Sequence, residues 1–315
     1  MRTSDTESGA AGGSAARGAD APLVSVIIPA YEAPADLRRC LEALEGQTWP
    51  ADRYEVIVVD NGSHADLAAV AAEFPHARCV REEKPGSYVA RNRGAGIAQG
   101  EVLAFTDSDC IPEGGWIEWG VTALAATTTA GWVAGRVDMF VADPARPTAA
   151  ELYDVTVLNF RQAENVRERR FGATANLFMR RDVYTAVGPF DERLRSAGDL
   201  EWGRRAVARG YAGAYADDAR VRHPARCTLV ETTRRAARLA AGVWQSRPDR
   251  SPLRFLGHLA RKLVPAVPFY ARVLAAAKPS RFADRAKVVL VALAVKYAEA
   301  WALIRFALGG GAERR

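Results

Sequence analysis

Val102-Leu103-Ala104-Phe105-Thr106-Asp107-Ser108-Asp109 is an apolar run that ends in two carboxylates separated by one serine. The run is short and stops at turn-forming residues, as a buried β-strand does. Two similar runs precede it, at 23–29 and 55–60, and residues with helical spacing follow each of these. Strands that alternate with helices predict βαβ units and a mostly parallel sheet with helices on both faces.

The remaining elements of the sheet are predicted from the same patterns. Short strands are expected over 77–81, 131–137 and 173–179, and helices over about 66–73, after Gly86, over 148–168 and over 199–209. Ligands of such sheets bind at the carboxyl ends of the strands. Asp60 and Asp107 stand at two of these ends, where we expect a nucleotide.

The charge of the chain is unevenly distributed. The 315 residues carry a net charge of +6, with 49% hydrophobic and 25% charged residues, which excludes collagen, coiled coils and wholesale disorder. From Arg222 onward there are 19 Lys and Arg against 5 Asp and Glu, whereas the first 221 residues have 24 against 32. A basic C-terminal part predicts a polyanionic partner, namely an anionic membrane surface, nucleic acid or a charged substrate.

The composition predicts three parts. Residues 1–21 are rich in Ala, Gly and Ser and are expected to be a disordered leader without a secretory signal. Residues 22–227 form the α/β domain, and residues 228–315 form a basic, apolar helical extension. The four cysteines contain no C-x-x-C pair, so we interpret them as reduced thiols of a cytoplasmic protein rather than a zinc or disulfide site.

The Asp107-Ser108-Asp109 turn is the sharpest chemical feature. Two carboxylates that leave one strand offer oxygen ligands, which suit a hard divalent cation such as Mg²⁺ or Mn²⁺. Such a cation can neutralise the charge of a departing diphosphate. Asp and Ser are also ordinary turn residues, and without other motifs a solvated turn is the commoner interpretation.

Six further motifs accompany this turn in a fixed order. They are VSVIIPAYE (24–32), VVDNGS (58–63), KPGSYVARNRG (84–94), GATANLFMRR (172–181), GPFDE (188–192) and GDLEW (198–202). Together with FTDSD (105–109), the series resembles the family 2 glycosyltransferases of the GT-A fold. The resemblance covers residues 23–226, about two thirds of the chain.

The resemblance implies a nucleotide-binding, mixed but mostly parallel sheet flanked by helices. It implies transfer of a sugar, with inversion, from a nucleoside diphosphate sugar to an acceptor hydroxyl, and a divalent metal, Mn²⁺ or Mg²⁺. It assigns donor contacts to nine residues: Pro29, Ala30, Tyr31, Glu32, Asp60, Gly86, Arg91, Asn92 and Asp107. It assigns the metal to Asp109 and His223, and the catalytic base to Asp199.

Asp199 has two interpretations. It begins an amphipathic helix, where an aspartate often serves as the N-cap. In the company of the other motifs we expect it to be the base that takes the proton of the acceptor hydroxyl. The family commonly carries Glu-Asp where this chain has Gly198-Asp199, and Glu201 is the fallback base.

The extension contains two apolar stretches, 263–277 and 288–308. The second has the length of a bilayer span but contains Lys296, Glu299 and Arg305, and each charge at the centre of a bilayer costs about 2.5–3.5 kcal/mol. We therefore expect either an interfacial helix or a helix packed on protein, with a span disfavoured. An interfacial helix predicts a peripheral protein at the inner face of the cell membrane, with a lipid-linked or cell-envelope glycan as acceptor.

The sequence disfavours several other functional classes. A nucleotidyltransferase of similar fold has a Gly-rich phosphate loop after the first strand, whereas this chain has Pro29-Ala30-Tyr31-Glu32; a dehydrogenase is disfavoured because G-x-G-x-x-G is missing there. A non-catalytic nucleotide-sugar-binding protein would not need Asp199 beside the two aspartates. The basic extension lacks regularly spaced aromatic residues for stacking on bases, so nucleic acid is not expected as a partner.

Overall fold

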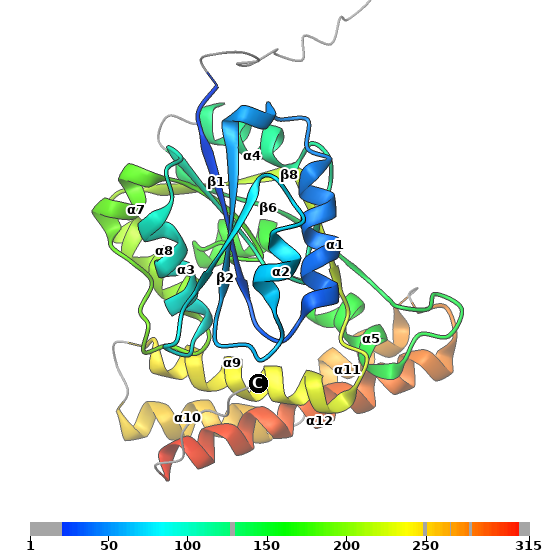
Figure 1. The fold of residues 1–315 in the computed structure, drawn as a ribbon. Helices are drawn as coiled ribbons and strands as arrows, with labels where there is room; N and C mark the ends of the chain where they lie inside the picture. The colour runs from blue at the N-terminus through cyan, green and yellow to red at the C-terminus, as the bar shows by residue number, and fades with distance from the viewer. Residues whose placement is uncertain (1–20, 127–129, 248–250, 265, 277–278, 309–315) are drawn as a thin grey trace, which may run out of the picture.

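The computed structural model describes residues 21–126, 130–247, 251–264, 266–276 and 279–308. The predicted leader, 1–21, lies outside the described residues except for Ala21, whose side chain is buried. An eight-stranded sheet is the centre of the described part (Figure 1).

The sheet has the strand order β3-β2-β1-β4-β7-β6-β8-β5. The strands are β1 (Val24–Ala30), β2 (Tyr54–Asp60), β3 (Ala77–Arg81), β4 (Val102–Thr106), β5 (Ile111–Pro112), β6 (Ala130–Phe140), β7 (Asn176–Arg180) and β8 (Ala212–Pro224). The strands β3, β2, β1 and β4 are parallel, and β7 is antiparallel to both of its neighbours. The predicted mixed α/β sheet is confirmed.

Helices cover both faces of the sheet because its strands are apolar on both sides. On one face, Val26 and Ile28 of β1 pack with α1 (Pro34–Glu45), α2 (Leu67–Ala71) and α4 (Trp116–Ala126). On the other face, Ile27 packs with α3 (Ser87–Ile97), α7 (Arg181–Val187) and α8 (Gly198–Ala208). Because β1, β2, β3 and β4 run in the same direction, their carboxyl ends lie at one edge of the sheet, where polar side chains gather.

Two predicted elements are wrong in extent. The helix expected over 148–168 consists of α5 (Ala149–Tyr153) and α6 (Gln162–Glu164), each extended by one π-helical turn and separated at 159–161, where Arg161 has a φ of 45°. The strand expected over 173–179 starts only at Asn176. The Gln162 amide explains the late start, because it bonds both the N–H and the carbonyl of Ala173 and so takes the place of a neighbouring strand.

The C-terminal part is helical, as predicted. It comprises α9 (Leu229–Gln245), α10 (Pro252–Leu263), α11 (Val267–Ala275) and α12 (Phe282–Ala307). Figure 1 shows α9 running along the lower edge of the sheet, with α10 and α12 beyond it. A capping box between Thr228 and Glu231 fixes the start of α9.

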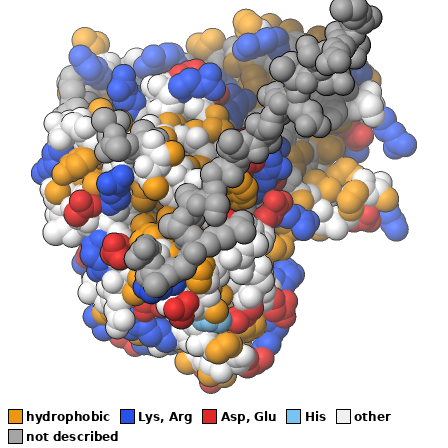
Figure 2. Space-filling model, turned by 90° about the horizontal axis from the view of Figure 1, so that it is seen from above, with side chains coloured by type: hydrophobic (Ala, Val, Ile, Leu, Met, Phe, Trp, Pro, Cys, Tyr) orange, Lys and Arg blue, Asp and Glu red, His pale blue; other side chains and the backbone are white. Residues whose placement is uncertain are grey.

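The helix α12 packs on protein along one side. Val288, Val291 and Val295 are buried in a cluster with residues of α5 and α9, whereas Leu290, Tyr297 and Trp301 are exposed. Among the described helices, none combines the length and the apolar character that crossing a bilayer requires. At the opposite end of the molecule, seen from above, acidic and basic side chains are interspersed (Figure 2).

Candidate active site

A cavity of about 320 Å³ opens at the carboxyl edge of the parallel strands. Its wall is built from the ends of β1, β4 and β8, the start of α3, the segment before β7, the start of α8, and α9. Nine of the twelve predicted site residues line it: Pro29, Ala30, Tyr31, Gly86, Arg91, Asp107, Asp109, Asp199 and His223.

Arg91 and Asp107 form an ion pair in the cavity wall. Arg91 is only 5% exposed and lies with its guanidinium carbon 5.5 Å from the ring centroid of Tyr88. A buried guanidinium needs an anion, and Asp107 supplies it. The pair holds Asp107 toward α3, whereas Asp109 faces the end of β8.

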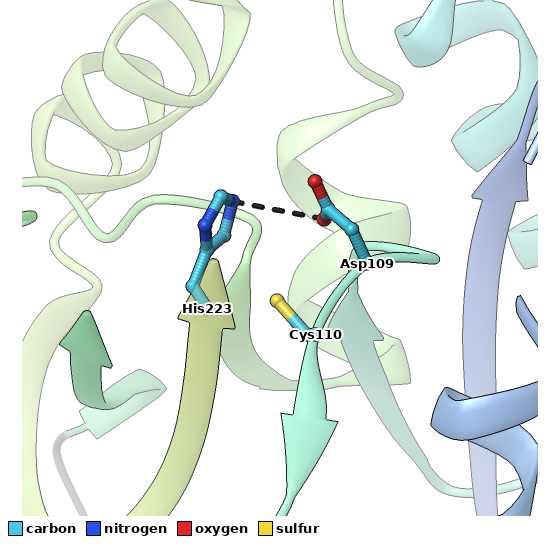
Figure 3. Close-up of side chains that lie close together, drawn as sticks. All are labelled: Asp109, Cys110 and His223. Atoms are coloured by element: carbon cyan, nitrogen blue, oxygen red, sulfur yellow. Dashed lines mark ion pairs between the residues drawn. The ribbon is translucent and has the colours of Figure 1, made fainter. Parts of the chain in front are cut away.

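Asp109 faces His223 at the end of β8 (Figure 3). The Oδ1 atom of Asp109 lies 3.6 Å from Nε2 of His223. The other ring nitrogen, Nδ1, is 2.7 Å from the carbonyl oxygen of Pro224, which can only accept, so Nδ1 carries the proton. In the neutral imidazole, the lone pair of Nε2 then faces the Asp109 carboxylate. Two such groups repel each other unless a proton or a cation lies between them.

Cys110 completes this cluster, and the ligand atoms of the three side chains lie within 4.8 Å of one another. The Cys110 thiol is buried and donates to the carbonyl oxygen of Ala175 at 3.7 Å. Burial raises its pKa well above the ordinary value, so the group stays a neutral thiol. Asp109 and His223 therefore offer the oxygen and nitrogen ligands of this cluster.

Asp199 is the second residue of α8, and the N-cap is Ala197. The interpretation of Asp199 as the N-cap is therefore wrong. Its Oδ1 atom accepts hydrogen bonds from the Leu200 N–H at 2.9 Å and from the Tyr88 hydroxyl at 3.4 Å. Desolvation by the surrounding protein raises the pKa of the Asp199 carboxyl, and these bonds together with Arg91 oppose the rise only in part. A carboxylate in this state is suited to accept a proton.

The sequence model of glycosyl transferase family 2 matches residues 25–188. A relative from Haloferax volcanii, "Glycosyltransferase AglE", is 39% identical over 241 residues, which cover 74% of this chain and 77% of the relative. The chain belongs to glycosyl transferase family 2. It is a glycosyltransferase that uses a sugar nucleotide, which favours sugar transfer over the nucleotidyltransferase and non-catalytic alternatives.

Solved structures give the same fold for this family 2 enzyme. The mannosyltransferase PcManGT from Pyrobaculum calidifontis, solved in complex with GDP-Man and Mn²⁺, is 21% identical, with a TM-score of 0.56 over 93% of this chain and 76% of that chain. TarS from S. aureus is 15% identical, with a TM-score of 0.51 over 90% of this chain and 55% of that chain. Both are GT-A glycosyltransferases, so the predicted GT-A fold is confirmed.

Three predicted residues of this glycosyltransferase do not line the cavity. Asp60, at the end of β2, pairs with Arg81 and accepts a hydrogen bond from the Ser63 N–H at 2.9 Å. The Glu32 carboxylate accepts from the His64 N–H at 2.8 Å, and these bonds with His64 lower its pKa. The Asn92 amide bonds Phe190, Tyr184 and Glu192. Their predicted donor contacts stay predictions.

The fallback base is placed elsewhere. Glu201 forms an ion pair with Arg205 at 2.7 Å, one helical turn along α8, and does not line the cavity. The arrangement leaves Asp199 as the carboxylate of this helix that faces the cavity.

Several lining residues had no individual prediction. They are Tyr88, Phe160, Arg195, Arg226, Arg235 and Arg238. Tyr88 lies inside the KPGSYVARNRG motif, so the sequence could have indicated it as a residue of the site. The two arginines of α9 belong to the basic extension, whose excess charge was the available signal.

Proposed function

We propose that this glycosyltransferase moves a sugar, with inversion and with the help of a divalent metal, from a nucleoside diphosphate sugar to an acceptor hydroxyl. The observation that carries the proposal is the position of Asp199. A desolvated carboxylate, held by Tyr88 and the Leu200 N–H, lines the same cavity as Asp109 and His223.

Asp199 acts in this proposal as the general base. The acceptor oxygen attacks the anomeric carbon from the face opposite the diphosphate, the bond from that carbon to the diphosphate oxygen breaks, and the hydroxyl proton passes to an Asp199 oxygen. A single displacement of this kind inverts the anomeric centre and needs no covalent glycosyl-enzyme. Desolvation raises the basicity of the carboxylate above that of an exposed aspartate.

Asp109 and His223 are the residues that would hold the metal. The fixed Nδ1 proton of His223 leaves Nε2 free to donate its lone pair toward Asp109, an arrangement typical of metal-binding histidines. One carboxylate with one imidazole fits Mn²⁺ better than Mg²⁺, which prefers oxygen ligands. When bound, the metal supplies positive charge to the leaving diphosphate. Arg91 stays paired with Asp107 and orients that carboxylate toward the donor side.

Nucleotide titration tests the donor site and the metal. We would titrate UDP, GDP and dTDP calorimetrically into the wild type and Asp109→Ala, with and without Mn²⁺; the Mn²⁺ complex of PcManGT with GDP-Man makes GDP the first choice. Binding of one nucleotide that requires Mn²⁺ and is lost in Asp109→Ala supports the proposal. Failure of all three nucleotides in the presence of metal contradicts it.

Asp199→Asn tests the base. The amide keeps the shape of the carboxylate but cannot take the proton, so transfer is expected to fall by about 10²–10⁴-fold, whereas nucleotide affinity stays near that of the wild type. Near-normal transfer by Asp199→Asn would remove Asp199 from the mechanism.

We further propose that the protein associates peripherally with an anionic membrane at its inner face and that its acceptor is a lipid-linked or cell-envelope glycan. The helix α10 supports this proposal, because Leu253, Leu256 and Leu263 are exposed on a helix that also carries Arg261 and Lys262. Apolar and basic side chains on one helix are typical of interfacial helices.

Vesicle flotation tests the membrane proposal. The full chain should float with vesicles that contain anionic phosphatidylglycerol and stay behind with neutral phosphatidylcholine. Leu253→Ser combined with Leu256→Ser should weaken flotation without loss of nucleotide binding. Equal flotation of the variant and the wild type would contradict the role of α10.

A further inference from the structure

The C-terminal extension contributes arginines to the wall of the catalytic cavity. Arg235 and Arg238 of α9 line the cavity together with Arg226, which lies just before that helix. These residues lie beyond the part of the chain that the family model matches, 25–188.

The arginine cluster, Arg226, Arg235 and Arg238, lies close to the Asp109 and His223 pair. The Phe160 ring is the link, since its centroid is 5.0 Å from the ring centroid of His223. The guanidinium carbon of Arg235 lies over the same Phe160 ring, 5.9 Å from its centroid. The cavity therefore has a carboxylate side and, one aromatic ring away, an arginine side.

Arg235 forms no ion pair with a carboxylate in the part of the chain that the structure describes. Asp154, which is fully buried, pairs with Arg226 through Oδ2 at 3.0 Å. Desolvation, together with the like charges of Arg226 and Arg238, lowers the pKa of Arg235 to about 10, although Asp154 acts in the opposite direction. Arg235 stays charged at neutral pH. A desolvated cation of this kind is costly unless an anion binds to it.

We propose that the arginine cluster is a phosphate-binding subsite that holds a phosphate or diphosphate ester on the acceptor. Guanidinium groups present a planar fork of N–H donors that matches phosphate oxygens. The proposal rests on the proposed function, in which Asp109 and His223 serve the diphosphate of the donor. A second anionic group close to the transferred sugar then belongs to the acceptor. The exposed Leu229 and Val230 in the first turn of α9 add apolar surface for the rest of such an ester.

The donor diphosphate is the other source of the same chemistry, so the test separates the two. Geranyl phosphate is the probe for an acceptor phosphate, and geraniol is its control without the phosphate. Calorimetry measures the affinity of the full chain for the probe at saturating nucleotide and Mn²⁺, and separately its affinity for the nucleotide.

Arg235→Gln is expected to weaken geranyl phosphate binding by about tenfold or more and to change nucleotide affinity by less than about twofold. Arg235→Lys should bind geranyl phosphate more weakly than the wild type and more tightly than Arg235→Gln, because lysine keeps the positive charge but lacks the planar pair of N–H donors. Arg234→Gln, exposed on the same helix, is the matched control and should bind both ligands like the wild type. If Arg235→Gln does not fold, as judged by circular dichroism, Arg238→Gln takes its place.

Each outcome decides the proposal. Loss of the probe alone supports it. Loss of nucleotide affinity alone assigns the arginines to the donor and overturns the acceptor subsite. An unchanged affinity for both ligands, or a wild type that does not bind geranyl phosphate, also overturns it. A wild type that binds the probe through Arg235 but binds no nucleotide supports the subsite and contradicts the proposed donor site instead.

Discussion

A Cβ atom added to Gly198 would lie 2.6 Å from the Cε2 atom of Tyr88. The Tyr88 ring thus occupies the space beside the residue that precedes Asp199, while its hydroxyl bonds both the carboxylate and the N–H of Asp199. The family commonly has a glutamate at the position of Gly198, and a glutamate has no room here. In this chain Tyr88 of α3 fills the space beside Gly198 and contacts the expected base.

Gly198→Ala should therefore disturb the base. The added methyl group has to push the Tyr88 ring away, which we expect to cost about 1–3 kcal/mol of stability and to lower kcat more than it changes KM. Chemical denaturation and steady-state kinetics measure the two effects. Gly96→Ala on α3 is the control, because an added Cβ there meets nothing within 4 Å. Equal stability of the two variants would contradict the crowding.

Tyr88→Phe should move the acid limb of the pH profile of kcat to higher pH. The Tyr88 hydroxyl is one of the groups that lower the pKa of Asp199, and burial raises it. Without the hydroxyl the pKa rises further, so the carboxyl is protonated, and inactive as a base, at a higher pH. Tyr184→Phe removes a partly buried hydroxyl that bonds Asn92 at 2.9 Å instead. Its acid limb should match that of the wild type.

His223→Ala should raise the Mn²⁺ concentration needed for half-maximal nucleotide binding by about tenfold or more. The reason is the loss of a nitrogen ligand whose orientation the Pro224 carbonyl fixes. Calorimetry at a series of Mn²⁺ concentrations after treatment with a chelator measures it. His258→Ala, which removes a ring stacked on Trp244 in the extension, should leave the Mn²⁺ requirement unchanged. If His223→Ala behaved in the same way, His223 would not be a metal ligand.

The strands of the parallel half of the sheet could be predicted because each is a short apolar run that ends at polar residues. The same logic placed Asp60 and Asp107 at the carboxyl edge of the sheet, and the structure brings Asp107, but not Asp60, into the wall of the cavity. The segment 148–168 could not be predicted in the same way. Its helical periodicity is interrupted by tertiary bonds, such as those of the Gln162 amide to Ala173, that a local pattern does not contain.

The arginine side of the cavity could not be predicted from local sequence patterns either. An excess of basic residues indicated an anionic partner, but not that Arg235 and Arg238, one turn apart on α9, face the catalytic cavity while Arg234 faces solvent. That distinction depends on how α9 is rotated, and the rotation is set by its packing against α12 and α5. For the same reason, Tyr88 could be placed in a motif but its contact with Gly198 could not.

The Arg91 and Asp107 pair predicts a stability effect that surface pairs do not show. Asp107→Asn leaves the guanidinium of Arg91, which is 5% exposed, without its anion. We expect a loss of about 2 kcal/mol, less than for a fully buried pair because the Asp107 side chain is 29% exposed. Arg91→Met combined with Asp107→Asn should lose less than the sum of the two single variants, since no charge is then stranded.

Urea denaturation of the two single variants and the double variant gives this coupling as a double-mutant cycle. Arg193→Met breaks an ion pair with Asp191 in which the arginine side chain is 89% exposed, and it should change stability by less than about 1 kcal/mol. Additive losses for Arg91 and Asp107 would mean that solvent, rather than Asp107, compensates the Arg91 charge. A positive coupling would identify the pair as the structural support of the Asp-Ser-Asp turn from which Asp109 reaches His223.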